Sequence, residues 1–172
     1  MPRRQRHDPS KTLVGFVVGD VEYAVHIARV KEITNPLGLV PLPHAPRSIA
    51  GVADFRGEVI PVIDLRARFS LPEAAPTRKT KWIVVDAGNR LIGLVVDAVS
   101  EVFGTAGAQL RPVPPLGHGD DVRGISGVTS HGGGLVFVLD TARLRELTDP
   151  LAVAGQIGPS APPVSLPPSS FS

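Results

Sequence analysis

Short apolar segments separated by glycine-containing turns run through the chain. Residues 13–18 form a continuous apolar segment, and Gly19-Asp20 follows with glycine first, the order favoured in a type II′ hairpin turn. Residues 21–25 then alternate between apolar and polar side chains, which is the period of a half-buried strand. The pattern therefore predicts a β-hairpin at the start of the folded region.

A second hairpin is predicted between residues 52 and 63. The apolar segments 52–55 and 58–63 flank Arg56-Gly57, which leaves room only for a tight turn. Asp64 follows at once. Because an aspartate before a short helical segment is a typical N-cap, we expect a helix over 65–69.

The other predicted elements are also short. Segment 27–33 has helical spacing that passes into strand near Val30, and residues 47–50 are expected to form one helical turn. Further strands are expected at 39–40, 82–85, 91–96, 100–103, 124–129 and 135–139, with a glycine- and proline-rich loop at 110–121 and a helix at 141–147 capped by Asp140.

One motif of glycine turn, apolar strand, aspartate and basic helix occurs twice. GEVIPVIDLRARF at 57–69 parallels GGLVFVLDTARLR at 133–145, and an earlier strand pair precedes each copy. The sequence thus predicts two similar β-units, joined near the polar linker 72–79. Many short strands with glycine turns favour small barrels, because closing a sheet removes exposed strand edges. The lack of a long crossover helix argues against a parallel sheet.

Both ends of the chain differ in composition from the middle. Residues 1–11 carry four basic residues and one acidic residue, whereas the remainder carries 14 basic and 15 acidic residues. The basic character therefore belongs to this N-terminal tail, which we interpret as a solvated, disordered end. Residues 148–172 are rich in proline and serine and are expected to form a second disordered tail.

Apolar runs in the chain are far shorter than the ~20 residues that span a bilayer. The N-terminal arginines are not followed by the apolar segment of a signal peptide. The chain has no cysteine, which excludes disulfides and thiolate metal sites. We therefore expect a cytoplasmic protein without direct membrane insertion.

Candidate catalytic motifs are weak. His131-Gly132-Gly133-Gly134 resembles the oxyanion-hole motif of some esterases, but Gly124-Ile125-Ser126-Gly127 lacks the G-x-S-x-G spacing of a nucleophile elbow, so a hairpin turn is the better explanation. The five histidines are scattered without metal-site spacing, and no phosphate-binding loop is present. We expect no metal, no cofactor and no enzymatic activity. A hydrolase centred on His131 is the alternative enzyme hypothesis.

A binding module is the other alternative. Such a module would be a small β-barrel that binds peptides or nucleic acid. Nucleic acid is disfavoured because residues 12–172 have a small net negative charge and the whole chain is only 5% aromatic.

Five segments carry a resemblance to a known family. They are VKEI at 30–33, IAGVADFRGEVIPVIDLRARF at 49–69, GLVVDAVSEV at 93–102, LRPVP at 110–114 and GISGV at 124–128. Their order resembles the CheW-like domain over roughly residues 12–147. The family pattern usually has Asn-Leu-Arg-Gly at the central turn, where this chain has Asp54-Phe55-Arg56-Gly57, so the arginine and glycine are kept.

The resemblance implies a mainly β fold of two interleaved, SH3-like five-stranded β-barrels with short helices. It also implies a non-enzymatic adaptor in chemotaxis-type signal transduction, part of a two-component system. Its expected partners are a CheA-type histidine kinase and the cytoplasmic tip of methyl-accepting chemoreceptors. The protein would be a monomer on its own and would join receptor arrays through these partners.

The resemblance also suggests which residues bind each partner. The receptor-binding residues would be Val30, Glu32, Arg56, Val99 and Val102, with the valines lining a groove for a coiled-coil tip. In that groove Arg56 would orient the receptor or pair with Glu32.

Kinase binding would use another face, around Ile49, Gly51 and Val52. A side chain at Gly51 would block close approach, although the glycine could also serve only to permit a turn.

Overall fold

The computed structural model describes residues 11–105, 110–113 and 124–149. The two predicted tails fall almost entirely outside these residues, as does most of the predicted loop at 110–121.

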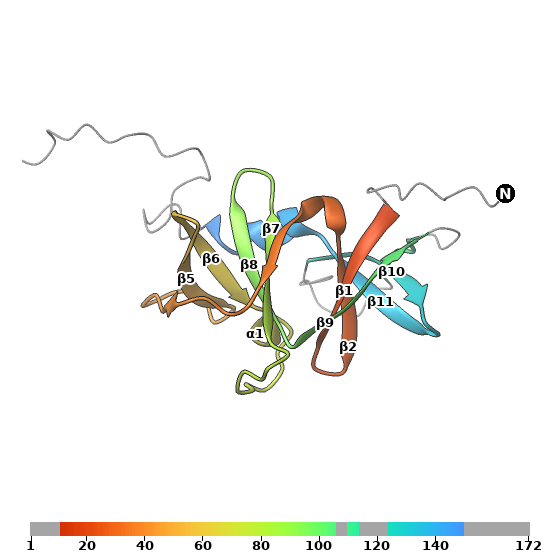
Figure 1. Ribbon diagram of the computed structural model, residues 1–172, viewed down its shortest axis with the longest axis horizontal. Coiled ribbons are helices and arrows are strands. Elements are labelled where there is room, and N and C mark those ends of the chain that lie inside the picture. Colours follow the sequence, from red (N-terminus) through yellow and green to blue (C-terminus); the bar gives the residue numbers. More distant parts are fainter. Residues whose placement is uncertain (1–10, 106–109, 114–123, 150–172) are drawn as a thin grey trace, which may run out of the picture.

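Within the described residues the protein is built from short strands with a few helical turns (Figure 1). The elements are β1 (Thr12–Val18), β2 (Val21–His26), the 3₁₀ turn η2 (Ile27–Arg29), β3 (Val30–Thr34), β4 (Leu39–Val40), β5 (Ile49–Phe55), β6 (Glu58–Asp64), α1 (Leu65–Arg68), β7 (Lys81–Asp86), β8 (Leu91–Val96), β9 (Ala98–Gly104), β10 (Ile125–His131), β11 (Gly134–Leu139) and α2 (Thr141–Glu146).

Most local predictions are confirmed. Gly19 has φ 63°, as the first central residue of a type II′ turn requires. The Asp64 carboxylate accepts hydrogen bonds from the N–H groups of Arg66 and Ala67, and Asp140 caps α2 in the same way. The helical turn expected at 47–50 is wrong, because Ile49 and the residue after it already belong to β5.

The strands form two sheets, and each sheet contains strands from both halves of the chain. One sheet has the order β10-β11-β2-β1-β9 and the other the order β3-β7-β8-β6-β5-β4. The chain therefore changes sheet after β2 and again after β8. The linker 72–79 joins α1 to β7. It therefore connects two strands of the same six-stranded sheet, β6 and β7, and does not join two successive units.

In each sheet one parallel strand pair joins the two halves of the chain. β6 pairs parallel with β8 and β11 pairs parallel with β2, whereas every other strand pair is antiparallel among the described residues. In each pair one strand, β6 or β11, leads into a capping aspartate and a short helix. The repeat seen in the sequence is thus a structural repeat, and each copy pairs with the other half of the chain.

Among the described residues neither sheet is closed by a full ring of backbone pairs, so the expected closed barrels are open at one seam. In the five-stranded sheet, side chains bridge the edge strands β9 and β10. The His131 ring stacks on Phe103 with centroids 3.8 Å apart, and His131 Nε2 lies 2.6 Å from Glu101 Oε1. In the six-stranded sheet, Leu37 lies on the connection between the edge strands β3 and β4 and packs against the apolar clusters around Trp82 and Phe55.

The largest apolar core lies between the two sheets. Val14, Phe16 and Tyr23 of the five-stranded sheet join Ile63 and Leu94 of the six-stranded sheet in one buried cluster. Burying a side chain of this size stabilises the fold by about 1.5–3 kcal/mol. The inter-sheet core therefore fixes how the two sheets sit together.

A polar contact fixes the point where the chain passes from β8 to β9. Asp97 accepts hydrogen bonds from the Gly19 N–H at 2.8 Å and from Arg66 Nε and Nη2 at 2.9 and 2.7 Å. Arg66 Nη1 also donates to the Pro72 carbonyl at 3.0 Å. Although burial opposes its ionisation, the bonds from Arg66 and Gly19 and the charge of Arg66 lower the pKa of Asp97 below its usual range.

We expect this contact to make stability depend on pH. Because the folded protein holds the pKa of Asp97 below its unfolded value, its contribution is full above about pH 4 and is lost as pH falls through the folded pKa. Asp97→Asn should destabilise the fold by about 1–3 kcal/mol at pH 7 and flatten the acid limb of the stability curve. Urea unfolding from pH 2.5 to 7 measures both effects. Glu146→Gln, at an exposed position on α2, is the control, and equal behaviour of the two variants would contradict this role of Asp97.

Candidate partner-binding surfaces

The β5–β6 hairpin presents Arg56 at its tip. Arg56 and Gly57 have φ 53° and 87°, so both central residues take the left-handed conformation of a type I′ turn. The Gly57 N–H donates to Asp54 Oδ1 at 2.8 Å, which holds the tip in shape. Asp54, one of the two residues that differ from the pattern given above, therefore has a structural role in the turn.

Arg56 and Glu32 are brought together, as one of the sequence hypotheses expected. Arg56 Nη2 donates to Glu32 Oε1, which ties the hairpin tip to the edge strand β3. The guanidinium also lies 5.6 Å from the ring centroid of Phe55. Because the Arg56 side chain is 72% exposed, this ion pair contributes at most about 1 kcal/mol to stability. The pair orients the arginine and leaves it accessible.

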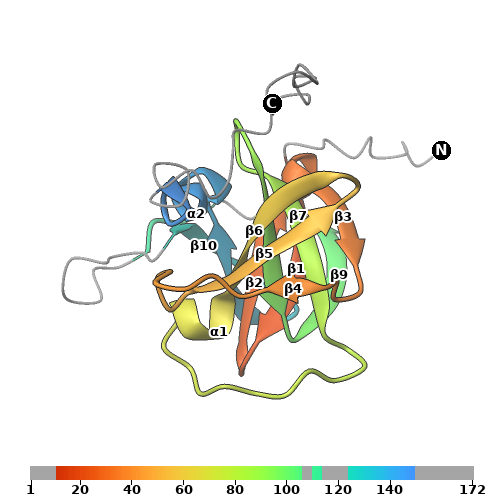
Figure 2. The ribbon, with the colours of Figure 1, turned by 90° about the vertical axis from the view of Figure 1, so that its left-hand side faces the viewer.

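The three valines of the predicted receptor groove differ in exposure. Val30 and Val99 are partly buried and pack against the core between the sheets, whereas Val102 is 55% exposed. Val30 begins β3, and Val99 and Val102 lie on β9, which are edge strands of different sheets. Both strands run along one side of the molecule (Figure 2). Ile33 on β3, which the sequence analysis did not select, is also exposed.

The predicted kinase-binding residues are less accessible than expected. Ile49 is buried in the core, and Val52 is half-buried. Gly51 has φ 152°, and a Cβ there would lie 2.2 Å from the Val40 carbonyl oxygen. The close approach that needs this glycine is therefore made by the chain's own strand β4.

Two exposed valines lie beside Val52 and were missed by the sequence analysis. Val40 pairs with Val52, and Val52 pairs with Pro61, so these three residues form one row across β4, β5 and β6. Val59 lies two residues from Pro61 on the same face. Val40 is 61% and Val59 51% exposed. We call Val40, Val52 and Val59 the β4–β6 patch; the strands β4, β5 and β6 that carry it lie on the near side in Figure 2.

The hydrolase hypothesis does not match the geometry. Ser126 and His131 lie five residues apart on β10, or roughly 16 Å along an extended strand. Ser126 Oγ donates to the Val138 carbonyl at 3.1 Å, and His131 faces Glu101. The two side chains therefore do not form a nucleophile–base pair.

Neither a metal centre nor a membrane-spanning helix is found among the described residues. They contain no group of three or more His, Asp or Glu side chains placed to hold a metal ion. Their helices are also too short to cross a membrane.

Comparison with known proteins places this geometry in a family. The CheW-like domain family matches residues 12–148. The chain is 38% identical over 106 residues to chemotaxis protein CheW of Rhizobium meliloti (strain 1021), which covers 62% of this chain and 68% of the relative. It is 32% identical over 148 residues to protein FrzA of Myxococcus xanthus, covering 85% and 92% of the two chains.

A solved structure has the same fold. The crystal structure of scaffolding protein TtCheW from Thermoanaerobacter tengcongensis superimposes with a TM-score of 0.67 at 27% identity, covering 76% of this chain and 88% of that one. The protein described here belongs to the CheW-like domain family.

We expect substitutions at Gly51 to act by displacing β4. Gly51→Ala should cost about 3 kcal/mol or more, because it adds a clash with the Val40 carbonyl to the strain of positive φ. Gly57→Ala should cost about 1 kcal/mol, because its φ is also positive but nothing lies within 4 Å of its Cβ. Urea unfolding compares the two, and equal losses would show that β4 does not pack tightly over Gly51.

Proposed function

We propose that this protein is a non-enzymatic adaptor that couples a CheA-type histidine kinase to methyl-accepting chemoreceptors in chemotaxis-type signalling. Family membership supports the chemotaxis scaffold role. The observation that carries the finer proposal is that exposed apolar side chains occur in two separate places around one shared core. One follows β3 and β9, and the other is the β4–β6 patch.

The receptor is assigned to the side formed by β3, β9 and the hairpin tip. Val102 and Ile33 supply exposed apolar area, while Val30 and Val99 support it from the core. An amphipathic helix of a receptor tip would lay its apolar stripe along these residues. Within the part of the chain that the structure describes, the Arg56 guanidinium donates only to Glu32, so its other N–H groups suit a carboxylate or carbonyl of the helix.

The kinase is assigned to the β4–β6 patch. Val40 and Val59 would be buried by the partner, with Val52 between them. Ile49 and Gly51 act beneath this surface, because the first fills the core and the second lets β4 approach β5. Such a surface binds by apolar burial and performs no chemistry of its own.

Arg56→Glu should weaken binding of a cognate receptor-tip fragment by about tenfold or more, because it removes a charge-assisted hydrogen bond and places a carboxylate beside Glu32. The melting temperature should change little, since the exposed pair contributes at most about 1 kcal/mol. Co-sedimentation with receptor-tip assemblies measures the binding. Arg78→Glu in the exposed linker is the charge-matched control.

The double variant Glu32→Arg/Arg56→Glu separates contact from positioning. It restores an ion pair of reversed polarity between β3 and the hairpin tip. If Arg56 contacts the receptor, as proposed, the double variant still binds weakly. Full recovery of receptor binding would mean that the pair only holds the hairpin in place and would overturn the contact.

Val40→Asp should reduce binding of the kinase regulatory domain by at least about tenfold, because a charge would be buried in an apolar contact. Leu135→Asp is the matched control, since Leu135 is similarly exposed at 55% but lies on the other sheet. Isothermal titration calorimetry measures both affinities. Equal losses in the two variants, or none in either, would remove the β4–β6 patch from kinase binding.

A further inference from the structure

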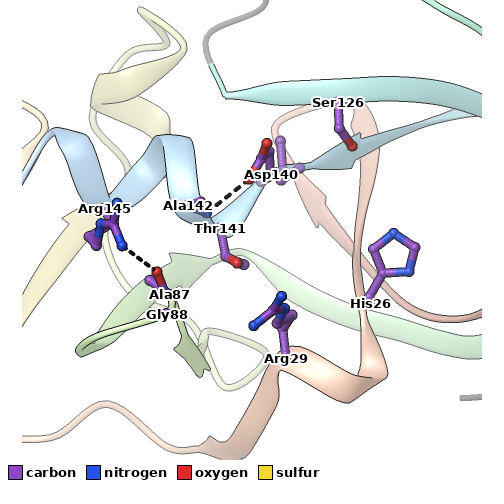
Figure 3. Close-up of a pocket in the computed structure, with 10 residues that line it drawn as sticks. His26, Arg29, Ala87, Gly88, Ser126, Asp140, Thr141, Ala142 and Arg145 are labelled. Carbon is purple, nitrogen blue, oxygen red and sulfur yellow. Dashed lines mark hydrogen bonds between the residues drawn. The ribbon is translucent and has the colours of Figure 1, made fainter. Parts of the chain in front are cut away.

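A cavity of about 330 Å³ lies where the two sheets meet, apart from both proposed partner surfaces. Its walls come from the end of β2 and the turn η2, the turn between β7 and β8, the strands β10 and β11, and the start of α2 (Figure 3). The cavity is therefore shared by elements of both sheets.

Basic side chains dominate the charge of this cavity. Arg29, Arg145 and His26 surround it on different sides (Figure 3). Arg145 Nη1 donates to the Ala87 carbonyl at 3.2 Å and to Asn89 Oδ1 at 3.4 Å, and both of these acceptors are neutral. Among the described residues Arg29 has no hydrogen-bond or ion-pair partner. Two guanidinium groups thus face one cavity without a carboxylate bound to either.

The single acidic residue of the cavity wall is already occupied. Asp140 Oδ1 accepts from the N–H groups of Ala142 and Arg143, and Oδ2 lies 3.7 Å from Arg143 Nε. These bonds direct its charge to the start of α2 and to Arg143, whose side chain does not line the cavity. The two guanidinium groups therefore keep unused N–H donors for a ligand.

We propose that this cavity binds a phosphate group. Guanidinium groups bind phosphate oxygens through paired, charge-assisted N–H donors, and two of them on different walls suit an anion whose oxygens point in several directions. The His26 ring, which lies across the cavity from Arg145 in Figure 3, supplies a further nitrogen. Neutral apolar ligands are disfavoured, because they would bury both arginine charges without a partner.

This site would add ligand binding to an adaptor whose other surfaces bind proteins. A phosphate held between Arg29 on η2 and Arg145 on α2 would join the turn that follows β2 to the helix that follows β11. Because a ligand that binds only the folded state raises its stability, phosphate should also raise the melting temperature in a concentration-dependent way.

The test is a titration of the full-length ¹⁵N-labelled protein with inorganic phosphate at constant ionic strength, read by amide chemical shifts. We expect saturable shifts at residues around the cavity, such as Arg29, Gly88 and Ala142. Arg29→Gln should weaken binding by about tenfold, the effect of losing one charge-assisted contact. Arg78→Gln, an exposed arginine of the linker that does not line the cavity, is the charge-matched control and should bind as the unmodified protein does.

O-phospho-L-serine in place of inorganic phosphate distinguishes the source of the group. Binding of both ligands, with the same loss in Arg29→Gln, means that the cavity accepts a phosphate carried by another molecule. Binding of inorganic phosphate alone means that it accepts the free ion. Shifts that do not saturate, that lie away from the cavity, or that persist unchanged in Arg29→Gln overturn the proposal.

Discussion

One apolar core shared by two sheets holds this molecule together, and the chain builds it by exchanging strands between its halves. β2 completes the sheet of β10 and β11, while β8 completes the sheet of β5 and β6. Residues such as Phe16 and Leu94 meet in the core that results. Where the chain passes from β8 to β9, the Asp97 carboxylate accepts hydrogen bonds from Arg66 and from the Gly19 N–H. Charge as well as packing therefore fixes this connection between the sheets. Neither sheet could bury its inner face alone.

Because the two sheets share one core, the edge strands that carry the proposed receptor surface are held by the same packing. Edge strands β3 and β9 belong to different sheets, yet Val30 and Val99 both reach the common core, so the strands keep a fixed relation. The seams left open by the backbone are covered by side chains, with His131 at one and Leu37 at the other. A partner that binds these strands, as we propose, would therefore lose little free energy to ordering the adaptor.

Local features were predictable from the sequence and long-range ones were not. The Arg56-Gly57 turn and the caps at Asp64 and Asp140 depend on residues a few positions apart, and the structure has all three. The parallel pairs join strands that are far apart in the chain, and no long crossover helix connects the paired strands. No local sequence pattern therefore predicts them. The exposure of valines on β4 and β6 was also not predictable. Where apolar residues occupy both faces of a strand, the sequence pattern does not show which face is open to solvent, as Val40 is.

The central claim is that two different surfaces of one rigid adaptor hold kinase and receptor at the same time. Its most direct test is to measure the affinity for the kinase regulatory domain in the presence and absence of saturating receptor-tip fragment, with the mass of the complex determined by light scattering. The account predicts a complex that contains all three proteins and a kinase affinity that the receptor does not abolish. Mutually exclusive binding, with only two-protein complexes at any ratio, would contradict it.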